Sequence, residues 1–187
     1  MLRMILAYGT IAGLVVGAVL SGIVIAMNGH QSLAWGMVIG YLTMLIGLSA
    51  VFVAIKRHRD VDLGGVIRFW PAFGLGLGIS LVAGIFYALA WELALAVTQM
   101  DFAGDYARFL IDEQKAKGVS GEELAKFTAE MDRFKVEYAN PLYRLPMTFT
   151  EIFPVGVLVS LVSAGLLRNS RFLPMQRATP PGASRAS

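Results

Sequence analysis

Residues 4–27 read MILAYGTIAGLVVGAVLSGIVIAM, an unbroken run of apolar and small residues that contains no charged side chain. A helix rises about 1.5 Å per residue, so this run makes about 36 Å of helix, more than the roughly 30 Å hydrocarbon core of a bilayer. A cleavable signal peptide has a shorter apolar region followed by a small-residue cleavage site. We therefore expect this segment to stay attached and to cross a membrane.

Three further apolar runs follow at about residues 35–55, 71–97 and 147–167, and the whole chain is 56% hydrophobic and only 16% charged. Backbone groups inside hydrocarbon must bond within their own segment or within a closed barrel. Barrel strands need only about ten alternating residues, whereas each of these runs has about 20 or more. We therefore predict an all-α integral membrane protein whose residues 1–168 form four transmembrane helices.

The residue types that the chain lacks exclude several kinds of chemistry. With no cysteine among its 187 residues, the chain has no disulfide, thiolate nucleophile or iron–sulfur ligand. Its two histidines, His30 and His58, lie in loops at opposite faces of the expected bundle, where both should be solvated and cannot share a metal ion. No phosphate-binding, zinc or nucleophile-elbow motif is present. We therefore predict no cofactor and no metal site. We also predict no nucleic-acid binding, because the excess positive charge lies beside the apolar runs, where it sets the orientation in the membrane.

Basic residues beside the apolar runs predict the orientation in the membrane. The N-terminal segment carries Arg3, residues 28–34 carry no Lys or Arg, residues 56–68 carry four and the C-terminal tail carries four. Cytoplasmic loops are enriched in Lys and Arg, so both termini and residues 56–68 are expected in the cytoplasm. The connection at 98–146 opposes this prediction, because its seven basic residues would lie outside. Residues 56–59 are interpreted as an orientation signal, with an anionic-lipid site as the alternative.

Small residues recur at four-residue spacing on three of the runs. They are Gly9, Gly13, Gly17 and Ser21 in the first run, Gly36 and Gly40 in the second, and Gly76, Ser80, Gly84 and Ala88 in the third. Residues four apart share one face of a helix, and small faces let helix backbones approach closely in lipid. We interpret these faces as packing surfaces within the chain, with a homo-oligomer interface or a glycine-lined pathway as alternatives.

Between the third and fourth runs, residues 101–139 have the pattern of an amphipathic helical hairpin outside the membrane. Ser120 and Glu123 have the spacing of a capping box, which predicts a helix start, and Gly118 ends the preceding helix. Apolar residues then recur at intervals of three and four as Leu124, Phe127, Met131, Phe134 and Tyr138. This interaction stripe either packs within the protein, docks a partner protein or lies among lipid headgroups. Residues 169–187 are rich in Pro, Gly, Ser and Arg and are expected to be disordered.

Two acidic residues, Glu92 and Glu151, lie within the apolar runs. Ionising a carboxylate in hydrocarbon is costly, so such residues are candidates for ligand or ion binding. In antiparallel helices both lie near the same outer surface and can share a shallow pocket. Their candidate partners are Arg144, Tyr87 and Tyr143. Pro154 has no N–H to donate to the carbonyl of Thr150, and this free carbonyl adds a ligand beside Glu151. The alternative is that each carboxylate merely bonds a hydroxyl or an arginine at the membrane interface.

Several sequence blocks carry a family resemblance. They are GMVIGYLTMLIGLSAVFVAIKRHRD at 36–60, LGGVIRF at 63–69, FYALAWE at 86–92 and NPLYRLPMTFTEIFPVGVLVSLVSAGLLR at 140–168. From Tyr8 to Arg168 the chain resembles a bacterial membrane family known as domain of unknown function 4199. The resemblance implies a small four-helix protein of the bacterial inner membrane with an extramembrane segment before the last helix. It implies no activity, cofactor or catalytic residue. Glu92 and Glu151 both lie in its motif blocks, which favours a shared role for them.

These patterns favour a non-enzymatic membrane protein that binds a partner or a small ligand at its outer face, where the hairpin and the carboxylates lie. Two carboxylates without a nucleophile, a metal cluster or a histidine make a poor catalytic set. The alternative is a small oligomeric transporter or channel subunit in which Glu92 and Glu151 relay a proton or a cation.

Overall fold

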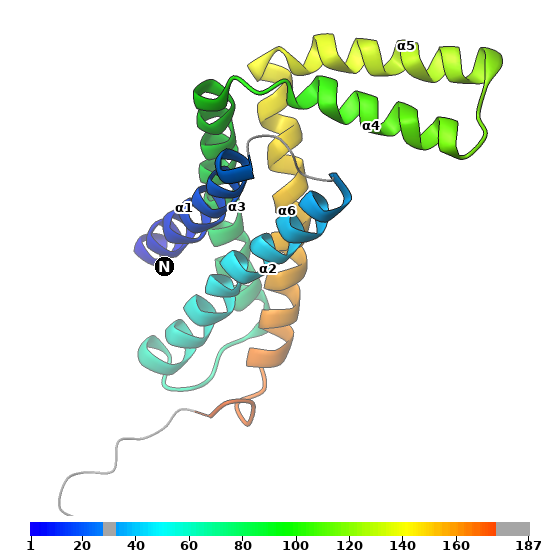
Figure 1. The fold of residues 1–187 in the computed structure, drawn as a ribbon. Helices are drawn as coiled ribbons and strands as arrows, with labels where there is room; N and C mark the ends of the chain where they lie inside the picture. The colour runs from blue at the N-terminus through cyan, green and yellow to red at the C-terminus, as the bar shows by residue number, and fades with distance from the viewer. Residues whose placement is uncertain (28–32, 175–187) are drawn as a thin grey trace, which may run out of the picture.

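The computed structural model describes residues 1–27 and 33–174, and in this part of the chain the secondary structure is helical, with no strand (Figure 1). Its elements are α1 (Leu2–Met27), α2 (Leu33–Arg57), the π-helical turn η1 (His58–Asp62), α3 (Phe69–Thr98), α4 (Phe102–Ala116), α5 (Gly121–Tyr138) and α6 (Pro141–Leu167). Helices α1, α2, α3 and α6 are long and apolar enough to cross a membrane. The predicted all-α fold with four candidate spans is therefore confirmed.

Helix α6 begins at Pro141, six residues before the predicted start of the fourth span at Met147. Asn140 occupies the N-cap position, and its side-chain oxygen accepts a hydrogen bond of 3.0 Å from the Leu142 amide. Pro141 follows in the first turn, where its missing N–H would have no intrahelical partner in any case. The cap therefore starts the helix, and Pro146, the residue just before the predicted start of the span, lies inside it.

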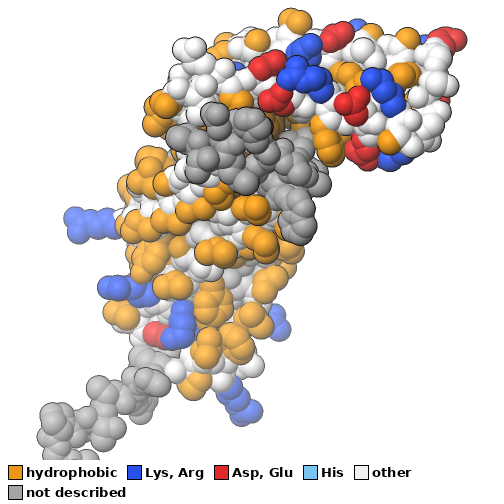
Figure 2. Space-filling view, in the orientation of Figure 1, with side chains coloured by type: hydrophobic (Ala, Val, Ile, Leu, Met, Phe, Trp, Pro, Cys, Tyr) orange, Lys and Arg blue, Asp and Glu red, His pale blue; other side chains and the backbone are white. Residues whose placement is uncertain are grey.

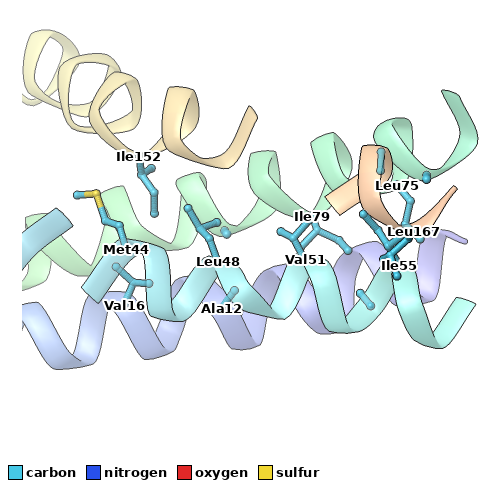
Figure 3. Close-up of a cluster of buried hydrophobic side chains, with 14 of the residues drawn as sticks. Ala12, Val16, Met44, Leu48, Val51, Ile55, Leu75, Ile79, Ile152 and Leu167 are labelled. Carbon is cyan, nitrogen blue, oxygen red and sulfur yellow. The ribbon is translucent and has the colours of Figure 1, made fainter. Parts of the chain in front are cut away.

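The four candidate spans form a bundle in which α3 packs against α1 and α6, and α2 packs against the other three helices. Fully or almost fully buried apolar side chains from all four helices meet inside it, including Val16, Leu48, Ile79 and Ile152 (Figure 3). The outward faces of the same helices expose many large apolar side chains, which Figure 2 shows spread over the bundle. Monomeric proteins in water rarely expose apolar patches of this extent, so the exterior of the bundle is typical of a membrane protein.

The pair α4–α5, which we call the arm, crosses one end of the bundle and projects to one side of it (Figure 1). The two arm helices pack against each other, and α5 contacts α6. Within the described residues of α4 and α5, Val136 is the only large apolar side chain that is exposed. Charged side chains gather on the arm instead (Figure 2). The base of the arm is therefore the boundary between an apolar and a polar surface.

The small face of α1 packs closely against α3. A Cβ atom added at Gly13 would lie 2.6 Å from both the Ala83 carbonyl oxygen and the Phe86 Cβ. Two turns further along α1, the Ser21 hydroxyl donates to the Ala90 carbonyl at 3.4 Å. Contacts this short leave no room for a larger side chain. The predicted use of this face for packing within the chain is therefore confirmed.

Helices α3 and α6 cross through a reciprocal contact of small residues. A Cβ atom added at Gly76 would lie 2.7 Å from the Ser160 side chain, and one added at Gly156 would lie 2.6 Å from the Ser80 Cβ. The two buried hydroxyls of Ser80 and Ser160 lie 3.3 Å apart. Small residues on both helices thus bring the two backbones together, and the predicted face of the third run also packs within the chain.

Residues 56–59 do not form the solvated loop that the sequence indicated. His58 is buried, and its Nδ1 lies 2.6 Å from the Asp62 carboxylate. Arg59 is fully buried and donates to the carbonyl oxygens of residues 172–173, at 2.9 and 2.6 Å. Backbone carbonyls after a helix end need such donors. The prediction of a solvated His58 is therefore wrong, and Arg59 fastens the segment after α6 to η1.

Some predictions fall wholly or partly outside the described residues. The surroundings of Gly36 are not described, whereas a Cβ atom added at Gly40 would meet no described atom within 4 Å. His30 lies in the segment 28–32, which the structure does not describe. The predicted disordered tail at 169–187 is described only as far as residue 174.

Candidate functional site

A bidentate ion pair joins the base of the arm to the bundle. Arg144, near the start of α6, donates through Nε and Nη2 to the two carboxylate oxygens of Glu92 on α3, each at 2.5 Å. Its Nη1 donates to the carbonyl oxygen of Tyr138, at the end of α5, at 3.0 Å. The side chains of Arg144 and Glu92 are only 15% and 22% exposed. One guanidinium therefore connects α3, α5 and α6.

Short connections bring these groups together. Glu92 lies less than two turns before the end of α3 at Thr98, and Arg144 lies in the first turn of α6. Residues 139–140 alone connect α5 to α6, so the end of α5 must lie beside the start of α6. Arg144 was among the candidate partners of the two carboxylates, and the structure places it on Glu92.

Aromatic side chains surround this ion pair. Trp91 donates through Nε1 to the Tyr138 hydroxyl at 2.9 Å, and the guanidinium carbon of Arg144 lies 5.4 Å from the centre of the Tyr138 ring. Phe102 of α4 packs against the rings of Trp91 and Tyr138, with centroid distances of 5.2 and 5.7 Å. Burial raises the pKa of Tyr138 to about 12, so its hydroxyl stays protonated at neutral pH. All helices that meet at the base of the arm thus contribute to one junction.

The predicted interaction stripe mainly faces the inside of the arm. Four of its members are half-buried and the last is buried: Leu124, Phe127, Met131, Phe134 and Tyr138. The Phe134 ring lies 5.8 Å from the ring of Tyr106 on α4. Most of the surface of the stripe is therefore packed within the protein, as the first of the three alternatives predicts. Ser120 occupies the N-cap position of α5 as predicted, but its side chain makes no capping hydrogen bond, so the capping box does not form.

The second carboxylate, Glu151, has a different environment. Its Oε2 accepts a hydrogen bond of 3.3 Å from the hydroxyl of Tyr87 on α3. Tyr87 is only 4% exposed, whereas Glu151 is exposed at the surface of the bundle. Within the described part of the chain, no Lys, Arg or His side chain bonds Glu151. This carboxylate therefore has one neutral hydroxyl as its side-chain partner.

The structure divides the predicted site residues into two groups. Glu92 bonds Arg144, and Glu151 bonds Tyr87. Arg144 and Glu151 are seven residues apart on α6, which places them about 10 Å apart along the helix. Thr150 is exposed, and its hydroxyl donates to a carbonyl of its own helix at 2.7 Å. Over residues 1–27 and 33–174, no group of three or more His, Asp or Glu side chains gathers in a way that could hold a metal ion.

One residue of the junction, Trp91, was not predicted from the sequence. It lies six residues before the end of the apolar third run, close to the charged connection. Trp and Tyr are enriched at this kind of boundary in membrane proteins. That enrichment was the available signal, although it does not say which groups the ring contacts.

Residues 7–169 match the family described as Protein of unknown function (DUF4199). The matched segment includes most of α1 and all of the other helices. Neither the search of curated proteins nor the search of solved structures found a match.

Proposed function

We propose a binding function for this chain, which belongs to the family described as protein of unknown function (DUF4199). In this proposal the chain is a bacterial inner-membrane protein that crosses the membrane through α1, α2, α3 and α6, with both termini in the cytoplasm. The arm lies outside the membrane at the outer face. The protein acts without catalysis, by holding a partner protein or a small ligand at the arm.

The attachment of the arm to the bundle carries this proposal. Arg144 bonds Glu92 and the Tyr138 carbonyl at the same time, and Trp91 bonds the hydroxyl of the same tyrosine. A bidentate, mostly buried pair restricts orientation far more than a solvated surface pair does. An arm that is held in one orientation presents a preorganised surface, and preorganisation reduces the entropy that is lost on binding.

The surface of the arm supports a location in water. Its helices expose Val136 as their only large apolar side chain in the described residues, whereas the bundle exposes many, such as Ile46 at 71%. A helix lying among lipid headgroups would instead turn an apolar face outwards. Ion pairs within one helix, such as Lys126 with Glu122 at 2.8 Å, cover the arm. A partner would therefore meet a charged surface rather than the apolar stripe.

Charge reversal on the outward face of α5 tests this proposal. Lys126 and Arg133 are both exposed and lie seven residues apart, on one face of the helix. We expect the variant Lys126→Glu/Arg133→Glu to recover about tenfold less partner or ligand in a quantitative pull-down from native membranes. Exposed substitutions change stability by only about 0.5 kcal/mol, so the protein should stay folded.

The control for this experiment keeps both charges. The variant Lys126→Arg/Arg133→Lys should recover the same amount of partner or ligand as the intact chain. Equal recovery of every bound species by the intact chain and by both variants would contradict a binding role for this face of the arm.

A second candidate function is that of a small oligomeric transporter or channel subunit in which Glu92 and Glu151 relay a proton or a cation. Glu151 favours it, because this carboxylate lies in a candidate span and bonds only the Tyr87 hydroxyl among the described side chains. Glu92 does not, since Arg144 already neutralises its charge. The test is proton or cation flux into proteoliposomes. If the variant Glu92→Gln/Glu151→Gln shows the same flux as the intact chain, this candidate is ruled out.

A further inference from the structure

We propose that Glu151 is a proton-binding site, occupied as the neutral carboxylic acid while the chain is embedded in the membrane. The site consists of the Glu151 carboxyl group on α6 and the Tyr87 hydroxyl on α3. It does not depend on the binding function proposed for the arm, and it does not use Glu92.

The single hydrogen bond to Glu151 gives little compensation for a negative charge. An O–H group that donates to an ionised carboxylate usually lies about 2.5–2.7 Å from it. The Tyr87 hydroxyl lies 3.3 Å from Oε2 of Glu151. Both residues belong to candidate spans, where ionising a carboxyl group is costly. The long contact and the apolar surroundings therefore both favour the protonated form.

The charged groups of α6 and α3 do not compensate Glu151. On α6, Arg144 lies two turns away, and all three of its nitrogen groups are engaged at the junction. On α3, Glu92 lies five residues beyond Tyr87 and is the partner of that arginine. A second carboxylate could only add negative charge, and the ion pair of Glu92 with Arg144 removes that effect.

The other two helices that pack against α6 are α2 and α5, and neither supplies a positive charge to Glu151. On α5, Tyr138 is the residue at the end that adjoins α6, and its hydroxyl accepts the Trp91 hydrogen bond. On α2, the titratable side chain nearest the start of the described helix is Tyr41, which is neutral and exposed. The charged residues of α2, at 56–57, lie at its far end. Among the described residues, the neutral Tyr87 hydroxyl is therefore the side-chain group that bonds Glu151.

A metal cation would find too few ligands at this position. Ca²⁺ and Mg²⁺ take about six or more oxygen ligands. Glu151, Tyr87 and the Thr150 carbonyl, which Pro154 leaves without an N–H donor, offer one carboxyl group, one hydroxyl and one carbonyl oxygen, and the described residues contain no cluster of three or more acidic or histidine side chains. A proton requires only one carboxylate oxygen. The donor set therefore points to a proton as the ligand.

Dicyclohexylcarbodiimide tests this proposal, with Glu92 as an internal control. The reagent adds to protonated carboxyl groups in apolar surroundings: the carboxyl oxygen bonds to the carbodiimide carbon, and the proton goes to a nitrogen. Membranes that contain the intact chain are treated at several pH values, and the peptides are measured by mass spectrometry. We expect an adduct on Glu151 that decreases as the pH rises, and none on Glu92, because both of its carboxylate oxygens already accept hydrogen bonds from Arg144.

Two variants extend this test. Glu151→Gln should lose the adduct, because an amide does not react. Tyr87→Phe removes the hydroxyl that stabilises the ionised carboxylate, so the adduct on Glu151 of this variant should persist to higher pH. Infrared spectroscopy separates protonation from reagent access: a carboxylic-acid band at neutral pH that Glu151→Gln abolishes supports the proposal even where no adduct forms. Equal adducts on Glu92 and Glu151, or the absence of both the adduct and the band, would overturn it.

Discussion

Replacing Arg144 with leucine should detach the arm from the bundle. The change leaves the Glu92 carboxylate without its partner and removes the donor to the Tyr138 carbonyl. Removing one partner of a fully buried pair costs about 3–5 kcal/mol. We expect about 2–3 kcal/mol here, because the two side chains are 15% and 22% exposed. Amide hydrogen exchange in α4 and α5 should accelerate by a factor of about 30–150, the equivalent of that free energy.

Two further variants make this experiment specific. Arg133→Leu removes an exposed arginine of the same arm and should leave exchange unchanged, because Arg133 makes no ion pair within the described residues. The double variant Glu92→Leu/Arg144→Leu should recover part of the protection, because it also removes the uncompensated carboxylate. Unchanged exchange in α5 of Arg144→Leu would show that the ion pair does not hold the arm.

A leucine at Gly13 is expected to prevent the close packing of α1 on α3. Its first side-chain carbon alone would lie 2.6 Å from the Ala83 carbonyl oxygen and 2.6 Å from the Phe86 Cβ. A backbone carbonyl cannot rotate away as a side chain can, so α1 would have to move. Overpacking by a few methylenes costs about 1–3 kcal/mol, and we expect at least about 3 kcal/mol here. The melting temperature in detergent should fall by about 6–12 °C.

Gly165 on α6 provides the matched control for the Gly13 variant. It is exposed, and a Cβ atom added there would meet no described atom within 4 Å. Gly165→Leu should therefore melt at or slightly above the temperature of the intact chain, because glycine is about 1 kcal/mol worse than alanine inside a helix. Equal melting temperatures for Gly13→Leu and Gly165→Leu would contradict the close contact of α1 with α3.

The candidate spans could be predicted from the sequence because every segment inside hydrocarbon must be apolar and must satisfy its own backbone hydrogen bonds as a helix. The charge-free run at 4–27 corresponds to α1, Leu2–Met27. The start of α6 was misplaced because a local cap outweighs composition: Asn140 starts this helix six residues before the predicted Met147. In contrast, α5 begins directly after Ser120, as predicted, although the serine side chain forms no cap.

The pairing of side chains between helices could not be predicted from the sequence alone. Arg144 and Tyr87 were both candidate partners of Glu92 and Glu151, but the assignment depends on how each helix is rotated about its axis. The spacing of residues along the chain does not determine that rotation.

The burial of Arg59 is a second feature that could not be predicted from the sequence alone. A cluster of charges after an apolar run is typical of a solvated loop. Its burial requires acceptors from another part of the fold, and the Phe172 carbonyl lies 113 residues further along the chain. Neither the composition nor the periodicity around residues 56–59 indicates such a distant partner.

Single-cysteine labelling tests the central claim most directly, namely that four helices cross the membrane and hold the arm on its outer side. The chain has no cysteine, so one can be placed at Lys126 on the arm, at Leu158 on the outward face of α6 or at Arg171 beyond α6. All three positions are exposed in the folded protein, so only the membrane should distinguish them. With a membrane-impermeant maleimide, we predict that Lys126→Cys is labelled in intact cells, Arg171→Cys only after permeabilisation, and Leu158→Cys in neither case. Labelling of Leu158→Cys, or labelling of Arg171→Cys in intact cells, would contradict this account.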